Sequence, residues 1–394
     1  MTLRALLALV LALALAACGG EGADEPDDAA PPATAPGEEE PRPEPEEPEE
    51  PRELTLGEPE VVAAGLEVPW GVAFLPGGEI LVTERPGRVR LVVDGELRPE
   101  PVGEVSGVVH RGEGGLLGIA LHPEFEETRF VYLYYTASDG NRVSRFTLGE
   151  ELALGDEQVL IGRLPSSAIH NGGAIAFGPD GMLYVTVGDA GQPELSADPQ
   201  SPAGAILRLS ADGQVPDDNP HGDSPVWSTG HRNPQGLAWD GEGRLYASEH
   251  GPSGEFGLCC RDELNLVEAG AFLGWPNRSG GESTGQGVES PGDPVDPVAT
   301  SGPDATWAPG GVALDPPSRT VLLTNLAGQQ LLRFTLAEGD PRSVESTEVA
   351  LDGLGRLRAV LRGPDDCFYV TTSNRDGRGQ PADDDDRLLR LCAA

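Results

Sequence analysis

Gly236-Leu-Ala-Trp239, followed by Arg244-Leu-Tyr-Ala-Ser248, is the stretch that decides the fold. It reads as two short strands joined by a turn, because alternation of apolar residues is the period of a strand. The same sequence of a small residue, an apolar run and a turn recurs six times along the chain. The six repeats begin at Gly71, Gly118, Ala174, Gly236, Gly311 and, more weakly, Ala359.

One such hairpin cannot bury both of its apolar faces, but several of them arranged around an axis can. The repeats therefore predict an all-β fold, a six-bladed β-propeller of four-stranded antiparallel blades. Helices should be scarce, because no segment of the predicted propeller keeps a helical period. The longest spacing, 75 residues from Gly236 to Gly311, is expected to hold the most functional connection.

The N-terminal residues 1–17 resemble an export signal. The apolar run from Ala5 to Ala17 follows Arg4 and is too short to span a bilayer as a helix. Leu15-Ala-Ala-Cys18 is similar to a bacterial lipobox, so we expect a lipoprotein-type signal peptide and lipidation of Cys18. The alternative is an ordinary signal peptide that ends near a cysteine. Either form predicts export to the cell envelope, and lipidation would anchor the protein on the periplasmic or extracytoplasmic face of a membrane.

Residues 18–53 are acidic and rich in proline, which predicts a disordered tether after the lipidated cysteine. Residues 54–394 should then form the propeller. Removing Arg4 and the net −12 of residues 21–53 from the net −38 of the whole chain leaves about −27 on the propeller. This charge argues against nucleic acid and anionic lipid as partners, so membrane contact is expected only through the lipid anchor. All 27 basic residues are arginine, so no lysine can act as a base.

Four cysteines fall in the predicted propeller. Cys367 begins a strand of the last repeat and Cys392 follows the next apolar run, which predicts a disulfide between them; two buried free thiols are the alternative. Cys259 and Cys260 are adjacent and are candidates for a vicinal disulfide. A zinc site is not expected, since no CxxC pair accompanies them.

Three of the six histidines, His170, His231 and His250, lie where loops lead into or out of the predicted inner strands. Such loops open onto one face of a propeller channel, so these groups can converge there with Arg232. A histidine beside an arginine suggests a general base next to a cation that stabilises developing negative charge. The other three histidines, His110, His122 and His221, are expected in turns or solvated loops.

Several carboxylates are expected to have structural roles. Glu249 and Asp262 should brace loops. Asp383 to Asp386 should form a solvated acidic turn, because consecutive carboxylates repel and splay apart.

The order of seven motifs resembles a known family. The motifs are Gly112-Glu-Gly-Gly-Leu-Leu-Gly118, Leu121-His-Pro-Glu-Phe125, His170-Asn-Gly-Gly173, Gly188-Asp-Ala-Gly191, Gly230-His-Arg-Asn-Pro-Gln-Gly236, Ser248-Glu-His-Gly-Pro252, and Asp262-Glu-Leu-Asn-Leu266 with Gly274-Trp-Pro276. In this order they resemble the soluble glucose/sorbosone dehydrogenases, and more narrowly the aldose sugar dehydrogenases that use pyrroloquinoline quinone (PQQ). The resemblance runs from about Pro69 to the last repeat.

This resemblance implies roles at matching positions. His170 corresponds to the catalytic base that takes the proton from the anomeric hydroxyl, and Arg232 to the arginine that polarises the quinone carbonyl. The remaining positions correspond to cofactor and metal contacts: Glu113 and Asn233 in the cofactor pocket, Gly251 and Pro252 as carbonyl ligands of calcium, and Arg356 and Arg358 on the cofactor carboxylates. Trp307 is expected either to wall this pocket or to be an ordinary core tryptophan.

The implied function is PQQ-dependent oxidation of the anomeric carbon of aldose sugars to lactones, with Ca²⁺ as a second cofactor. Hydride would pass to PQQ, and electrons would pass on to a separate acceptor, a quinone or a cytochrome. Ile169 and the lysine-free stretch Asn325–Gln330 depart from the glucose-specific relatives and favour the aldose subgroup. Two alternatives stay open, a calcium-dependent sugar lactonase and a non-catalytic propeller that serves as a binding module.

Overall fold

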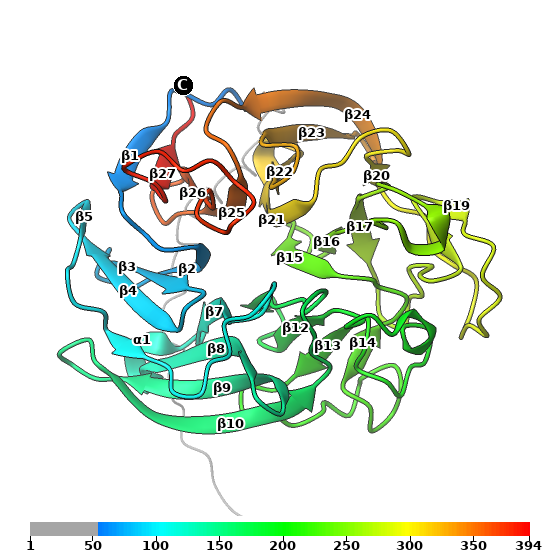
Figure 1. Cartoon of the computed structure of the whole chain (residues 1–394), viewed down its shortest axis with the longest axis horizontal. Helices are drawn as coiled ribbons and strands as arrows, with labels where there is room; N and C mark the ends of the chain where they lie inside the picture. Colours follow the sequence, from blue (N-terminus) through cyan, green and yellow to red (C-terminus); the bar gives the residue numbers. More distant parts are fainter. Residues whose placement is uncertain (1–53) are drawn as a thin grey trace, which may run out of the picture. The chain divides into compact units, whose positions relative to one another are not determined.

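A computed structural model describes residues 54–394 as a ring of six small antiparallel sheets (Figure 1). The predicted six-bladed β-propeller with four-stranded blades is therefore confirmed. The predicted signal peptide, Cys18 and the acidic tether lie outside the described residues. No helix within residues 54–394 is long and apolar enough to cross a membrane.

The blades follow one another along the chain, and each begins with its innermost strand. Blade 1 contains β2 (Pro69–Phe74), β3 (Ile80–Glu84), β4 (Arg88–Val93) and two short edge strands paired with β4, β5 (Glu96–Leu97) and β6 (Gly103–Glu104). Blade 2 contains β7 (Leu116–Leu121), β8 (Phe130–Ala137), β9 (Gly140–Leu148) and β10 (Leu154–Leu164). Blade 3 contains β11 (Ile175–Phe177), β12 (Leu183–Val187), β13 (Ala205–Leu209) and β14 (Val226–Ser228).

The second half of the ring repeats this order. Blade 4 contains β15 (Pro234–Trp239), β16 (Leu245–Glu249), β17 (Glu263–Val267) and β20 (Ala299–Thr300). Blade 5 contains β21 (Pro309–Asp315), β22 (Thr320–Asn325), β23 (Leu331–Ala337) and β24 (Asp340–Leu351). Blade 6 contains β25 (Leu357–Arg362), β26 (Phe368–Thr372), β27 (Leu388–Leu391) and, as its outer strand, β1 (Glu60–Ala63). The ring is thus closed by a strand from the beginning of the described chain, so no blade is left with an open junction.

Helical structure is scarce in residues 54–394, as predicted. It consists of α1 (Phe125–Thr128) and three single 3₁₀ turns, η1 (Pro193–Leu195), η2 (Glu255–Gly257) and η3 (Pro316–Ser318). The long connection of blade 4 adds a small hairpin of β18 (Arg278–Ser279) and β19 (Glu282–Ser283).

The hydrophobic core consists of six clusters, one at each junction between neighbouring blades. Strand alternation produces this arrangement. In β3, Leu81 packs toward blade 2, whereas Ile80 and Val82 pack toward blade 6. The second strands of blades 1, 3, 4 and 5 are buried at every position, so their successive side chains pack toward the two neighbouring blades.

The small residue that opens each repeat permits close contact between inner strands. In five blades the pairing of the inner strand shifts register at this residue, which marks a β-bulge. The Gly118 N–H donates to the Gly173 carbonyl of the next blade at 3.0 Å, and a Cβ on Gly118 would overlap that oxygen. Glycine is therefore required here by the distance between blades.

Candidate active site

A polar cavity of about 580 Å³ lies at one end of the central channel. Its wall comes from loops of several blades, which include the charged and histidine side chains Arg85, Glu113, His170, Arg232, His250, Glu255, Arg356, Arg358, Asp376 and Arg378. In an antiparallel blade, the start of the first strand and the end of the second lie at the same edge. His170 and Arg232 precede first strands, and Arg85 and His250 follow second strands, so the topology delivers all four to this cavity.

His170 is held in place through one of its ring nitrogens. Its Nδ1 lies 2.6 Å from Oδ1 of the buried Asp189, and Asp189 Oδ2 also accepts the Trp275 indole N–H at 2.9 Å. An imidazole that donates Nδ1–H to a carboxylate keeps Nε2 as an acceptor. The backbone of His170 has φ of +54°, a left-handed conformation in the loop before β11. Its N–H donates to Glu113 Oε2 at 2.9 Å, which fixes the loop further.

Arg232 lies next to this base. Its Nη2 is 2.5 Å from Glu255 Oε1, its Nη1 donates to the His250 carbonyl at 3.3 Å, and its guanidinium lies over the Trp275 ring. Glu249 supports Arg232 from behind. One of its carboxylate oxygens accepts the Arg232 backbone N–H, and the other contacts Nδ1 of His231. The cation is thereby fixed beside His170, an arrangement that can take up a proton and stabilise negative charge on neighbouring atoms.

Glu113 connects the loop that carries His170 to the last blade. Its Oε1 pairs with Arg378 at 3.2 Å, while Oε2 accepts the His170 N–H. Burial alone would raise the pKa of Glu113, but the opposing effects of His250, the His170 N–H and Arg378 hold it below its ordinary value. Glu113 is therefore ionised at neutral pH.

The cavity is locally cationic although the protein is acidic. Five arginines line it, against three carboxylates, Glu113, Glu255 and Asp376. Within the described chain Arg358 makes no ion pair; its Nη1 donates to Gln235 Oε1 at 2.6 Å and its guanidinium lies over Trp70. Burial, and then repulsion from Arg85 and Arg356, lowers the pKa of Arg358 to about 9. An enclosed arginine without a carboxylate partner fits an anionic ligand, because such a ligand would supply the missing counter-charge.

Two predicted cofactor contacts and one of the three histidines do not line the cavity. Asn233 is buried and uses Oδ1 to accept the N–H groups of Gly172 and Gln235, so it supports the wall from behind. Trp307 is half-buried and packs against Phe334, beside the core cluster between blades 4 and 5. His231 is fully buried between Glu249 and Ser228.

Gly251 and Pro252 lie between two cavity residues, His250 and Ser253, but do not line the cavity themselves. The carbonyl oxygens of Cys260 and Arg261 crowd the Gly251 Cα so closely that a Cβ would overlap them. Main-chain oxygens therefore gather at this point, and hard oxygen donors of this kind suit calcium. Residues 54–394 contain no grouping of three or more His, Cys, Asp or Glu side chains that could hold a metal ion.

Both predicted cysteine pairs are bonded. Cys367 and Cys392 are joined across blade 6, and Cys259 is joined to Cys260. The acidic turn differs from the prediction: Asp383 and Asp384 are exposed, but Asp385 and Asp386 are buried. Asp386 accepts the N–H groups of Asn374 and Val68, which accounts for its burial despite the neighbouring carboxylates.

Several residues of the site were not predicted from the sequence. Asp189, Arg85, Gln235, Glu255, Asp376 and Arg378 all contribute to the cavity or to His170. A signal existed for Arg85 and Asp189, since each stands just after the second strand of a blade, as His250 does. Glu255 lies in the insertion of blade 4, which belongs to no repeat, so the repeat pattern could not predict its position.

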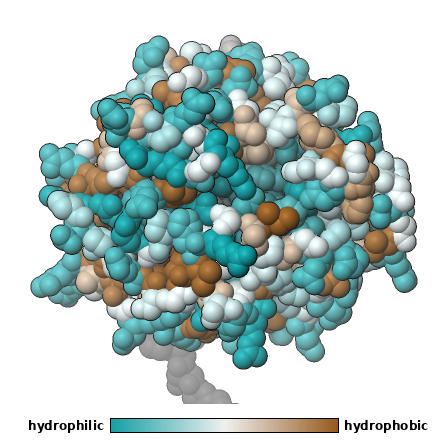
Figure 2. Space-filling model, in the orientation of Figure 1, coloured by the Kyte–Doolittle hydropathy of each residue, from teal (hydrophilic) through white to brown (hydrophobic). Residues whose placement is uncertain are grey.

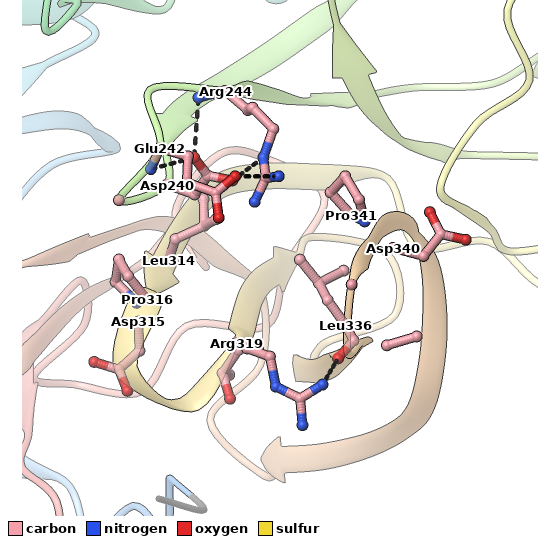
Figure 3. Close-up of a pocket in the computed structure, with 14 residues that line it drawn as sticks. Asp240, Glu242, Arg244, Leu314, Asp315, Pro316, Arg319, Leu336, Asp340 and Pro341 are labelled. Carbon is pink, nitrogen blue, oxygen red and sulfur yellow. Dashed lines mark hydrogen bonds and ion pairs between the residues drawn. The ribbon is translucent and has the colours of Figure 1, made fainter. Parts of the chain in front are cut away.

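Two other pockets have a different character. Beyond Trp70, Gln235 and Arg358 the channel continues as a pocket of about 440 Å³ with a mostly apolar wall. A pocket of about 300 Å³ lies between blades 4 and 5, at the turns that join first to second strands (Figure 3). There Arg244 pairs with Asp240, and Arg319 donates to the Leu336 carbonyl, so the drawn guanidiniums already have partners. This pocket lies at the opposite end of β15 from Arg232.

The face in Figure 2 is mainly hydrophilic, with hydrophobic residues in small separate groups. Fold and site together define a propeller whose axial cavity brings a histidine held by a carboxylate together with a cluster of arginines. The sequence from residue 66 to 390 matches the family model "Glucose / Sorbosone dehydrogenase".

Known proteins match over most of the chain. Aldose sugar dehydrogenase YliI of Escherichia coli (strain K12) is 30% identical over 81% of this chain and 90% of its own length. Quinoprotein glucose dehydrogenase B of Acinetobacter calcoaceticus is 31% identical over 56% of this chain and 52% of its own. The PQQ-bound form of the Streptomyces coelicolor aldose sugar dehydrogenase is 40% identical and superposes with a TM-score of 0.77, covering 86% of this chain and 98% of that one. The chain belongs to the glucose/sorbosone dehydrogenase family, and it is an oxidoreductase of sugar CH–OH groups.

Proposed function

We propose that this protein oxidises the anomeric carbon of aldose sugars to lactones with PQQ as the bound oxidant. The observation that carries the proposal is the cavity itself, where the His170–Asp189 pair stands beside Arg232 and where Arg358 makes no ion pair with any of residues 54–394. The PQQ-bound relative and the quinoprotein relative support the choice of cofactor. PQQ is a tricarboxylate, and its negative charge matches the cationic wall.

The residues of the cavity have different roles in this reaction. Arg356 and Arg358, with Arg85 nearby, would bind carboxylates of the ligand, and Arg232 would stabilise negative charge on a ligand oxygen. When bound, PQQ supplies the chemistry of a two-electron hydride acceptor. His170 Nε2 takes the proton of the anomeric hydroxyl while the hydride and its two electrons leave the same carbon, so that a C=O bond forms. Asp189 holds the imidazole in the tautomer that this step needs.

Calcium and cell location complete the proposal. Calcium would be held by main-chain oxygens at Gly251 and Pro252 and would neutralise part of the ligand charge. The electrons then pass to a separate acceptor, a quinone or a cytochrome. Export and lipid anchoring through Cys18 would place this reaction in the cell envelope; labelling with a palmitate analogue tests it, and an unlabelled wild-type protein with a labelled control lipoprotein would contradict it.

Reconstitution tests the main proposal. Cofactor-free protein is titrated with PQQ, with and without calcium, while binding is followed by calorimetry and dye reduction is followed with a set of aldoses. We expect PQQ binding, calcium-dependent dye reduction and formation of a lactone. Dye reduction by no aldose, in protein shown to contain PQQ, would exclude the proposed activity.

A further inference from the structure

The loop from Ser253 to Cys260 brings an additional carboxylate into the cavity. It follows β16 in the longest insertion of the chain, and it is closed at its base by the Ser253–Cys259 bridge and by the Gly254 N–H bond to the Leu258 carbonyl. Phe256 packs on Trp275, with ring centroids 5.4 Å apart. The loop is therefore held against the residues that position His170 and Arg232.

Glu255 lies at the reacting end of this loop. Its Oε1 is 2.5 Å from Arg232 Nη2 and 3.7 Å from His170 Nε2, and its Oε2 accepts the Ser253 N–H at 2.6 Å. Its side chain is 29% exposed. An ionised carboxylate has about four acceptor positions, so Glu255 can accept further hydrogen bonds while these contacts remain.

The other two carboxylates of the cavity are engaged with arginines of the last blade. Asp376 receives two bonds from Arg356 and one from the Arg378 N–H. Glu113 receives the His170 N–H and pairs with Arg378. Among the carboxylates that line the cavity, Glu255 is the one within 4 Å of the available nitrogen of the base.

The position of Glu255 bears on how an aldose can be oriented in the cavity. The anomeric carbon has two neighbours in the ring: the ring oxygen, which only accepts hydrogen bonds, and C2, whose hydroxyl can donate. A carboxylate accepts but does not donate, so it attracts the C2 side and repels the ring oxygen. With the anomeric hydroxyl on His170 Nε2, a group 3.7 Å away is within reach of the hydroxyl on the adjacent carbon.

We propose that Glu255 determines specificity by accepting a hydrogen bond from the C2 substituent, so that the enzyme selects aldoses with a donor at C2. This inference rests on the proposed function. It would also place the C2 side of the sugar, rather than the ring oxygen, beside Glu255. An ammonium at C2 should bind at least as well as a hydroxyl, because it adds an ion pair.

The test compares D-glucose, 2-deoxy-D-glucose and D-glucosamine in protein reconstituted with PQQ and calcium. For the wild type, kcat/KM for the 2-deoxy sugar should be roughly 10- to 100-fold below that for glucose, the range for losing a hydrogen bond to a charged group. In Glu255→Ala this ratio should fall to about twofold or less. Glu255→Gln should keep part of the preference for glucose and lose the preference for glucosamine, since an amide accepts but carries no charge.

A matched control and a second readout complete the design. Glu282→Gln removes a carboxylate that pairs with Arg261 outside the cavity and should leave all ratios unchanged. Calorimetry with 1,5-anhydro-D-glucitol and its 2-deoxy analogue measures the same discrimination without turnover. Discrimination in binding without turnover would contradict only the proposed function. Equal use or binding of the paired sugars by the wild type, no binding of either analogue, or an unchanged ratio in Glu255→Ala would overturn the inference.

Discussion

The Cys367–Cys392 and Cys259–Cys260 bonds lie in two regions with different contacts. The first joins strands of blade 6 where β1 and β27 close the ring, and Cys367 is buried in the core between blades 6 and 1. The second lies at the base of a loop that reaches the cavity and exposes Phe256. The blade 6 disulfide and the loop that carries His170 therefore lie at different places in the fold, so loss of the disulfide should mainly affect stability, whereas a change at His170 should mainly affect chemistry.

The largest expected effect is a loss of turnover in the cavity variant His170→Asn. Asparagine tolerates the positive φ of this position but cannot act as the base, so kcat should fall by about 10²- to 10⁴-fold. Steady-state kinetics checks this, and calorimetry with PQQ should show a much smaller change in affinity. Turnover equal to the wild type would remove His170 from the role of base, and a large loss of melting temperature would break the separation of the two regions.

The next effect is on the ring-closure side, in the double variant Cys367→Ser with Cys392→Ser. The disulfide closes a loop with a sequence separation of 25 residues, for which chain entropy predicts a loss of about 3 kcal/mol of stability. Denaturant unfolding should show this loss, while KM and kcat at 25 °C should stay unchanged. A change in KM without a change in unfolding free energy would contradict the comparison.

How far the sequence predicts these two regions differs for a physical reason. The small residue, apolar run and turn of each repeat are local, so the six blades and the Cys367–Cys392 pair could be predicted. His170 and Arg232 could be placed from their positions in loops that open on the channel, whereas Glu113, Arg356 and Arg358 were placed by a family resemblance. The structure brings all five to one cavity.

The rest depends on contacts between distant parts of the chain. Asp386 is buried because Val68, 318 residues away, donates a hydrogen bond to it, and no local pattern reveals such a partner. Glu255 reaches Arg232 through the shape of an inserted loop that belongs to no repeat. Trp307 packs against the core cluster between blades 4 and 5 and does not line the cavity; the sequence left both positions open.

Within the cavity, the variants Arg358→Met and Arg356→Met should change the melting temperature in opposite directions. Arg358 has no carboxylate partner among the described residues, so its loss should raise the melting temperature of cofactor-free protein by a few degrees. Arg356 pairs with Asp376, and its loss would leave that carboxylate buried, so the melting temperature should fall.

Both arginine variants should bind PQQ roughly 10- to 100-fold more weakly, since each loses a charged hydrogen-bond donor to the ligand. Thermal melts with and without PQQ measure the two effects together, because at a fixed ligand concentration the stabilisation by a bound ligand grows with the logarithm of its affinity. Equal shifts in the cofactor-free melts of the two variants would contradict the assigned difference in pairing.

The smallest effect concerns Asp386, in the ring-closure region. Burial, despite its N–H donors, raises the pKa of Asp386 to about 6, above the ordinary value of 3.8. The folded protein therefore holds this proton more tightly than the unfolded chain does. The resulting stabilisation is complete below pH 4 and is lost as the pH rises through 6, by at most about 3 kcal/mol. In Asp386→Asn the group no longer titrates, and the difference in unfolding free energy between wild type and variant should change between pH 4 and 6 and be flat above 7. Parallel curves across this range would show that Asp386 has the same pKa in the folded and unfolded states, and that the acidic turn is solvated after all.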